Sequence, residues 1–316
     1  RLALSDNGTW TQTQSTDVPT GSGFASSLKM DCTTADAAVA AGSFHFLNYK
    51  FEAQDCQLFK KGTSSAEYIT VAFWIKSNKT GTFTVEILDP VGSQRTISQT
   101  FTIDSGSTWE KKVLSFVGDT SSAQPNTNAI GLGINIWMTG GSTYTGGTLQ
   151  TAWGAKTDNE RADTSINIAD STSNEYYLTG LQVEVGEYNA TTIPPFQHES
   201  FGDNLLRCQR YYQRLLESEN VYFAGGWYYT AGNVVGFKDL VTTMRTTPTL
   251  ICATVTNGYT FYRVSDPDHV NSLGLNSASP TNIAITNTSE VSGTAGDAGG
   301  WYSSSASNQL DCTAEL

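Results

Sequence analysis

Charge is scarce in this chain, and cations are scarcer than anions. Only 15% of the 316 residues are charged, and 18 basic residues stand against 30 acidic ones, for a net charge of -12. No basic run exceeds the pairs Lys60-Lys61 and Lys111-Lys112. Because nucleic acids and anionic membranes bind clustered cations, we expect neither as a partner. The longest apolar run, residues 71–75, is far shorter than the ~20 residues of a membrane span, so we expect no membrane insertion.

Reactive side chains are also few. The five cysteines are odd in number and too widely spaced for a disulfide framework or a zinc motif, so we predict buried thiols in a protein folded under reducing conditions. We expect structural roles for the only histidines, His45, His198 and His269. The chain lacks a nucleophile elbow, a phosphate-binding loop, a zinc-protease motif and a dinucleotide fingerprint. We therefore predict neither an enzyme nor a cofactor.

What the chain does have in quantity is Thr, Ser, Asn and Gly, a mixture that favours strands and tight turns. Apolar and polar residues alternate over residues 69–75 and again over 83–87, which predicts two neighbouring strands joined by a hairpin at 78–81. Further strands are predicted at 96–103, 109–117, 129–138 and 176–185. In 129–138 the alternation predicts one core face and one open face lined partly by glycine. About eight such strands form a two-sheet sandwich or jelly roll.

A proline-containing junction divides the chain. Pro194 and Pro195 end the first sheet, and Ser200 is a helix cap with Asp203 three residues later. We predict a helix over 201–216 that carries an apolar face, which we expect at an oligomer or interdomain contact: Leu205, Cys208, Tyr212 and Leu215. The predicted architecture is all-β, with a jelly-roll domain at 1–192, a linker and helix at 193–216, and a smaller C-terminal β-sandwich at 217–316. Strands in the last region are predicted at 221–229, 234–240, 249–255, 259–264, 282–287 and 309–315.

The junction also carries a resemblance. Its run Pro-Phe-Gln-His-Glu-Ser-Phe-Gly-Asp, followed by Arg-Cys-Gln-Arg-Tyr-Tyr, resembles the C-terminal region of tail-fibre and related appendage proteins of tailed double-stranded DNA phages. The blocks at 66–77, 174–186 and 310–316 are similar to strands of the same proteins, whose first module is like a carbohydrate-binding module. The resemblance implies a virion protein that is assembled in a bacterial cytoplasm, forms a homotrimer and contacts the host surface. Since the chain begins with Arg1, we expect a preceding portion that docks on other virion proteins.

Aromatic residues beside glycine and polar loops are the candidates for binding. Flat rings stack on sugar faces while polar neighbours bond the hydroxyls, so we predict a host-surface glycan as ligand. The long polar segment 139–168 is read as a loop and a candidate binding surface. The candidate residues are Trp137, Tyr144, Trp153, Trp227, Tyr228, Tyr229, Trp301 and Tyr302.

The same sequence is compatible with other interpretations. Asp158, Glu160 and Asp163 could offer oxygen ligands to a structural Ca²⁺, but they lack the spacing of an EF-hand loop. A purely structural capsid or tail component would bury its aromatic residues against another virion protein. A polysaccharide depolymerase would need two carboxylates ~5 to 10 Å apart, and with 30 acidic residues the sequence does not exclude such a pair.

Overall fold

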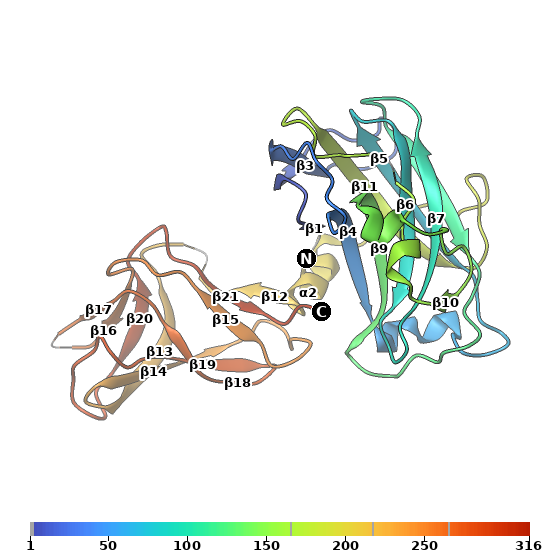
Figure 1. Cartoon of the computed structure of the whole chain (residues 1–316). Helices are drawn as coiled ribbons and strands as arrows, with labels where there is room; N and C mark the ends of the chain where they lie inside the picture. The colour runs from blue at the N-terminus through green and yellow to red at the C-terminus, as the bar shows by residue number, and fades with distance from the viewer. Residues whose placement is uncertain (1–2, 165, 217, 265) are drawn as a thin grey trace. The chain divides into compact units, whose positions relative to one another are not determined.

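The structure is a computed structural model that describes residues 3–164, 166–216, 218–264 and 266–316. The chain forms two compact units, Arg1–Gln197 and His198–Leu316. Almost all regular structure is antiparallel strand, which confirms the all-β prediction (Figure 1). Within the described residues, no helix is long and apolar enough to cross a membrane.

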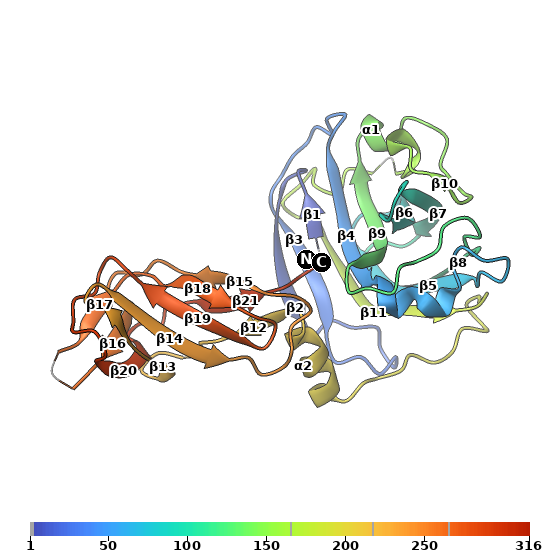
Figure 2. The same cartoon turned by 90° about the horizontal axis from the view of Figure 1, so that it is seen from below.

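The first unit is a sandwich of two sheets that lie face to face (Figure 2). One sheet has six strands in the order β1 (Ala3–Ser5), β4 (Phe44–Glu52), β9 (Ile130–Gly140), β6 (Gly81–Asp89), β7 (Arg95–Ile103) and β10 (Gly154–Ala155). The other has five, in the order β2 (Thr9–Ser15), β3 (Ser27–Thr34), β11 (Glu175–Val185), β5 (Ile69–Ser77) and β8 (Glu110–Phe116). A 3-10 helix, η1 (Ala53–Phe59), follows β4.

The core of the first unit confirms the period-two alternation. Val71 and Phe73 of β5 are fully buried in the same cluster as Val85 and Ile87 of β6. The predicted hairpin between these strands is wrong, because β5 and β6 belong to different sheets. Residues 78–80 cross the sandwich, and Gly81 takes a left-handed φ of 138°. Alternation could not separate the two cases, since a hairpin and a crossing both direct the apolar residues into one core.

The predicted loop 139–168 has structure of its own. Beyond β9 it contains α1 (Ser142–Thr145), β10 and a 3-10 helix, η2 (Asp158–Glu160). We call the described residues 141–164 and 166–168 the strap. In Figure 2, α1 lies outside the layer formed by β4, β9 and β6. Consistent with this cover, every residue from Gly131 to Gly140 is buried, so the prediction of an open face on this strand is wrong.

A buried carboxylate holds the strap to the sheet. Glu86 on β6 is fully buried and accepts two hydrogen bonds from the guanidinium of Arg161, at 2.8 and 2.9 Å. It also accepts from Asn135 Nδ2 at 2.8 Å, Trp137 Nε1 at 2.9 Å and Thr96 Oγ1 at 3.0 Å. Burial disfavours the charged form of Arg161, but Glu86 outweighs it and raises the pKa of the guanidinium. A buried charge with this many partners fixes one geometry for the segment.

The second unit is a smaller sandwich. Its three-stranded sheet has the order β12 (Tyr212–Arg214), β21 (Leu310–Thr313) and β15 (Thr249–Cys252). Its seven-stranded sheet has the order β17 (Asp268–Val270), β16 (Tyr259–Tyr262), β20 (Ala298–Ser303), β13 (Tyr222–Thr230), β14 (Asn233–Asp239), β19 (Asn282–Asn287) and β18 (Gly274–Ala278). Between the sheets lies a core that includes Tyr259, Phe261 and Trp301.

The junction helix is shorter than predicted. α2 (Phe201–Gln209) begins at Ser200, whose hydroxyl accepts from the backbone N–H of Asp203. The prediction that it continues to residue 216 is wrong, because Tyr212–Arg214 pairs with β21. Leu205 and Cys208 are exposed on α2, whereas Tyr212 lies on β12 and Leu215 is buried in the core of the second unit. The four residues therefore do not share a helix face.

Candidate functional site

The outer face of the seven-stranded sheet carries a set of exposed aromatic side chains. The register places Tyr262 of β16, Gly300 of β20, Gly225 of β13 and Phe237 of β14 in one row across four adjacent strands. With strands ~4.8 Å apart, the row is roughly 14 Å wide. Its two ends are aromatic and its middle is glycine.

The rings form two groups. Tyr222, Tyr262 and Tyr302 make the tyrosine cluster, with ring centroids 5.1 to 6.0 Å apart. Trp227 and Phe237 stack on each other, with centroids 5.1 Å apart and an interplanar angle of 24°. Tyr222 is 65% exposed, Phe237 49% and Trp227 44%, which is unusual for large rings. We call the two groups together the aromatic surface.

Several glycines of this sheet are required by the fold, whereas Gly225 is not. A Cβ at Gly236 would meet Trp301 at 2.4 Å, and one at Gly299 would meet the backbone of Tyr262 at 2.1 Å. At Gly300 a Cβ would lie 2.9 Å from the ring of Tyr222. Nothing lies within 4 Å of the Cβ position at Gly225. Since glycine weakens a strand and often marks the close approach of a ligand, this open position requires another explanation.

A groove of about 540 Å³ opens over Gly225. Tyr222 and Phe237 line it on opposite sides, and Phe223, Ala224, Lys238, Asp239 and Gly300 complete the lining. The ladder between β13 and β14 starts only at Gly225 and Phe237, so the adjoining strand ends diverge. The site therefore combines aromatic walls with a main-chain floor, an arrangement suited to a ligand with apolar faces and polar edges.

The binding residues predicted in the second unit differ in their exposure. Trp227 and Tyr229 are exposed, and Tyr302 is partly exposed. Tyr228 and Trp301 are fully buried, so their assignment as binding residues is wrong. Trp301 belongs to the core and contacts Phe261. Tyr228 donates a hydrogen bond to Asp268, and burial together with that carboxylate raises the pKa of its hydroxyl.

Three residues of the aromatic surface were not among the sequence candidates: Tyr222, Phe237 and Tyr262. Phe237 follows the apolar residues Val234 and Val235, so the local pattern has no clear period from which to assign its face. The sequence did contain one signal for this surface, because three of its strands carry both glycine and aromatic residues. Strand register, which brings those glycines together, is not contained in the local pattern.

The candidate binding residues of the first unit make contacts within the unit itself. Trp137 is fully buried under the strap, which contradicts its assignment as a binding residue. Tyr144 is partly buried against Trp137, with centroids 5.1 Å apart, and the guanidinium of Arg161 lies 5.8 Å from its ring. Trp153 donates its indole N–H to the carbonyl of Val117 at 2.6 Å, and Lys61 Nζ lies 5.5 Å from its ring. These contacts give each ring a structural role.

The acidic run within the strap forms ion pairs. Asp158 lies 2.9 Å from Lys156 Nζ and 3.7 Å from Arg161, and the Lys156 hydrogen bond is the main cause that lowers the pKa of this carboxyl. The described part of the chain has no group of three or more His, Cys, Asp or Glu side chains placed to hold a metal ion. The calcium site formed by Asp158, Glu160 and Asp163 thus lacks support.

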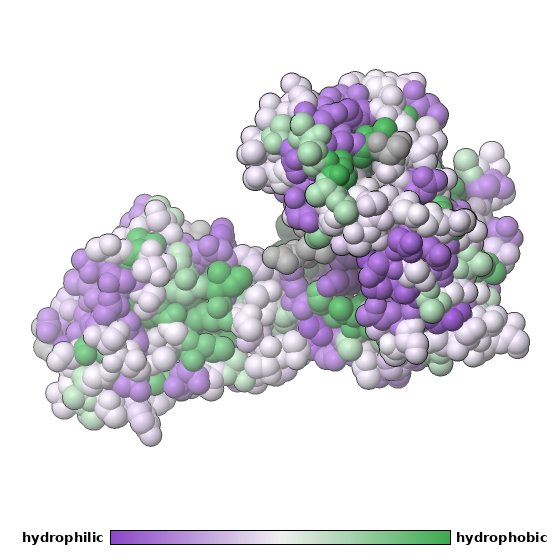
Figure 3. Space-filling view, viewed as in Figure 1, coloured by the Kyte–Doolittle hydropathy of each residue, from purple (hydrophilic) through white to green (hydrophobic). Residues whose placement is uncertain are grey.

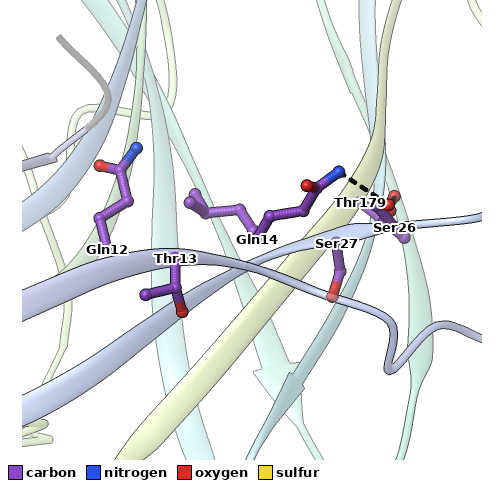
Figure 4. Close-up of a pocket in the computed structure, with 7 residues that line it drawn as sticks. Gln12, Thr13, Gln14, Ser26, Ser27 and Thr179 are labelled. Atoms are coloured by element: carbon purple, nitrogen blue, oxygen red, sulfur yellow. Dashed lines mark hydrogen bonds between the residues drawn. The ribbon is translucent and has the colours of Figure 1, made fainter. Parts of the chain in front are cut away.

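A second depression lies at the edge of the five-stranded sheet (Figure 4). It measures about 420 Å³ and is lined mostly by hydroxyl and amide side chains, including Gln12, Thr13 and Ser27. Gln14 donates to the hydroxyl of Ser26 at 2.9 Å across it. It has no aromatic lining residue, so it offers no ring for stacking, and we regard the aromatic surface as the stronger candidate.

The sequence matches no protein-family model and no curated protein. Among solved structures, the chain is similar to the enzymatically active domain of tailspike protein 4 of bacteriophage CBA120, at 13% identity and a TM-score of 0.32. That match covers 58% of this chain and only 19% of the tailspike chain. A family 11 carbohydrate-binding module from a cellulosomal cellulase of Clostridium thermocellum is 10% identical, with a TM-score of 0.30, over 58% of this chain and 86% of the module.

A tandem pair of family 22 carbohydrate-binding modules from Paenibacillus barcinonensis is similar along almost the whole chain. It covers 99% of this chain and 86% of its own, at 8% identity and a TM-score of 0.31. At such scores these similarities carry no argument about function.

Proposed function

We propose that this chain is a non-enzymatic attachment protein of a phage virion, of the tail-fibre type, which binds a host-surface glycan through the aromatic surface of its second unit. The observation that carries the proposal is the open groove over Gly225 between the rings of Tyr222 and Phe237. The virion context comes from the resemblance of the junction sequence to phage appendage proteins.

The chemistry of the groove suits a sugar. A pyranose ring has apolar C–H faces that stack on aromatic rings and a rim of hydroxyls that need hydrogen-bond partners. Tyr222 and Phe237 supply the rings that line the groove, and Trp227 extends the aromatic surface by stacking on Phe237. Asp239 and the strand ends supply polar groups. Exposed large rings beside polar groups are a common mark of a binding surface, because burying them there releases water from apolar area.

We further propose that the protein acts as a homotrimer associated through α2. No residue of this helix is buried, and Phe201, Leu205 and Leu206 are 82%, 42% and 50% exposed. Burying these side chains against copies of the same helix would remove apolar area from water. Three copies of a weak glycan site would then bind a cell surface through avidity.

The double variant Trp227→Ala with Phe237→Ala tests the glycan site. Stacking contributes roughly 0.5–1.5 kcal/mol per ring pair, so the loss of two rings is expected to weaken binding by about fivefold or more on a glycan array or in host-cell adsorption. Tyr49→Ala is a matched control, because Tyr49 is an equally exposed ring, at 46%, in the first unit. Unchanged binding by the double variant would overturn the site.

Particle assembly and the release of reducing ends distinguish the attachment protein from a structural component and from a depolymerase. A purely structural component would show impaired particle assembly in the double variant and no glycan binding by the wild type. A depolymerase would release reducing ends from host polysaccharide, which the proposed attachment protein does not.

A further inference from the structure

The open end of the groove points to the class of sugar that binds. We propose that the space between the diverging ends of β13 and β14 is a subsite for the N-acyl group of an amino sugar. The inference rests on the proposed glycan binding and makes it more specific, since it names the substituent that the groove recognises.

Main-chain polar groups face the gap between the diverging ends of β13 and β14. β13 is paired with β20 as far as Tyr222, and β14 is paired with β19 as far as Asp239, but β13 and β14 pair with each other only from Gly225 and Phe237 onward. The N–H of Leu240 donates to the carbonyl of Thr281 on the β19 side. Because main-chain groups alternate in direction along a strand, those of Asp239 face the gap.

Aromatic rings form the walls of the groove on both sides of Gly225. Tyr222 leans over Gly300, where its ring would be only 2.9 Å from a Cβ, and the ring of Phe237 is half-exposed on the other side. The space over Gly225 between them is empty to 4 Å. A small group that enters from the open end is thus flanked by aromatic rings and meets main-chain amides at the floor.

An N-acetyl group matches both features. Its amide offers one N–H and one C=O, the same pair that a strand presents to its neighbour, and its methyl group has an apolar surface for the rings. A hydroxyl in the same place would leave the apolar walls without a partner. Gly225 lies two residues, or roughly 7 Å, from Trp227 along the strand, so a sugar ring on Trp227 places a neighbouring substituent near the gap.

An extended peptide has the same amide chemistry but fits the groove less well. A peptide that adds a strand to a sheet needs an edge that is open along its length. Here β13 and β14 close onto each other at Gly225 and Phe237. A short side branch of a glycan can enter a gap that is closed at one end, whereas a continuous chain cannot pass through it.

Matched ligands test the inference on the full-length chain. Calorimetric titration would compare N-acetylated chitotriose with cellotriose, and the methyl glycosides of N-acetylgalactosamine and galactose. The members of each pair differ by an acetamido group in place of the 2-hydroxyl on every sugar residue. We expect the acetylated member of at least one pair to bind tenfold more tightly or better.

The variant Gly225→Val fills the subsite. No neighbour lies within 4 Å of its Cβ position and its φ is not left-handed, so the fold is expected to persist, as thermal melting would verify. We expect this variant to lose the preference for the acetylated sugar and to retain the weaker binding of its hydroxyl partner. Gly232→Val, at a second glycine with open space, is the control and should bind as the wild type does.

The outcomes distinguish failure of the acyl subsite from failure of the glycan site. Equal affinity for both members of each pair, or a preference that survives Gly225→Val, overturns the acyl subsite and leaves the glycan site in place. Failure of all four ligands to bind counts against the subsite and the glycan site together. Loss of all binding in Gly225→Val with an intact fold would show that the groove holds the sugar ring itself, which also overturns the subsite.

Discussion

Trp227 and Tyr228 are neighbours in the sequence, yet one is exposed on the aromatic surface and the other is fully buried. Alternation along a strand explains the difference, since successive side chains point to opposite faces. The sequence marked both as candidates because glycine precedes them, but which of them faces outward depends on which side of β13 the core of the second unit occupies. The sequence indicates that aromatic rings gather near glycine. Which of these rings are exposed is determined by the fold.

His45 gives a prediction at the residue scale. It is fully buried, its Nε2 lies 2.6 Å from the hydroxyl of Tyr176, and burial lowers its pKa to about 3. Below pH 6.5 the unfolded chain gains a proton that the folded chain does not, so the stability of the first unit should fall as the pH drops from 6.5 towards 3. The expected loss is up to roughly 1.4 kcal/mol per pH unit.

Thermal melting of wild type and His45→Gln at pH 7 and pH 5 measures this effect. Because the variant lacks the titrating ring, its stability should decrease less between the two pH values. Equal decreases in both proteins would show that His45 does not contribute. The expectation that this histidine has a structural role agrees with its burial.

At the scale of elements, the strands were the easiest features to predict. β7, β8, β9 and β11 lie within a few residues of their predicted positions, because each has one strongly apolar face. The crossing between β5 and β6 and the strap were missed for one reason. Both depend on which distant strands are neighbours, and a buried polar residue such as Glu86 cannot be distinguished from a solvated one without its partner Arg161.

The helix α2 was predicted at its start and missed at its end. Its cap at Ser200 is a local signal, whereas its end at Gln209 depends on pairing between Tyr212–Arg214 and the distant strand β21. Gln213 and Leu215 are both buried there, and their spacing of two residues is that of a strand and not of a helix. Tertiary pairing thus determined the fate of Tyr212 and Leu215.

The proposed trimer contact is tested on this helix. Since Leu205 and Leu206 are exposed, the variant Leu205→Asp with Leu206→Asp should fold normally but no longer associate. Light scattering is expected to report a trimer for the wild type and a monomer for the variant. Asn204→Asp adds negative charge to the same exposed helix and should leave the trimer intact. A trimer that persists in the double variant would exclude α2 as the contact.

At the scale of the whole molecule, the two units have separate cores. The surface of the second unit shows a patch of apolar residues in Figure 3. Its exposed apolar side chains include Ile251 of β15, which is 40% exposed, and Leu275 of β18, which is 38% exposed. The structure divides the chain between Gln197 and His198, so the predicted linker and helix at 193–216 contribute mostly to the second unit.

Separate expression of residues 1–197 and 198–316 follows from this division. Each fragment retains its own core, so we expect each to melt in a single cooperative transition. Glycan binding should be found only in the fragment 198–316, which contains the aromatic surface. Binding by the fragment 1–197 alone would move the site to the first unit.

If the protein is the attachment protein proposed above, the empty space over Gly225 has a consequence for the evolution of host range. Most changes in a protein core are limited by stability, but a side chain at this position meets no neighbour and adds none of the strain of a left-handed backbone. Under the proposed attachment function, a replacement here would alter which sugar is bound while the sandwich still folds. If phages escape host resistance through this protein, variants at this single position should be among the first to arise.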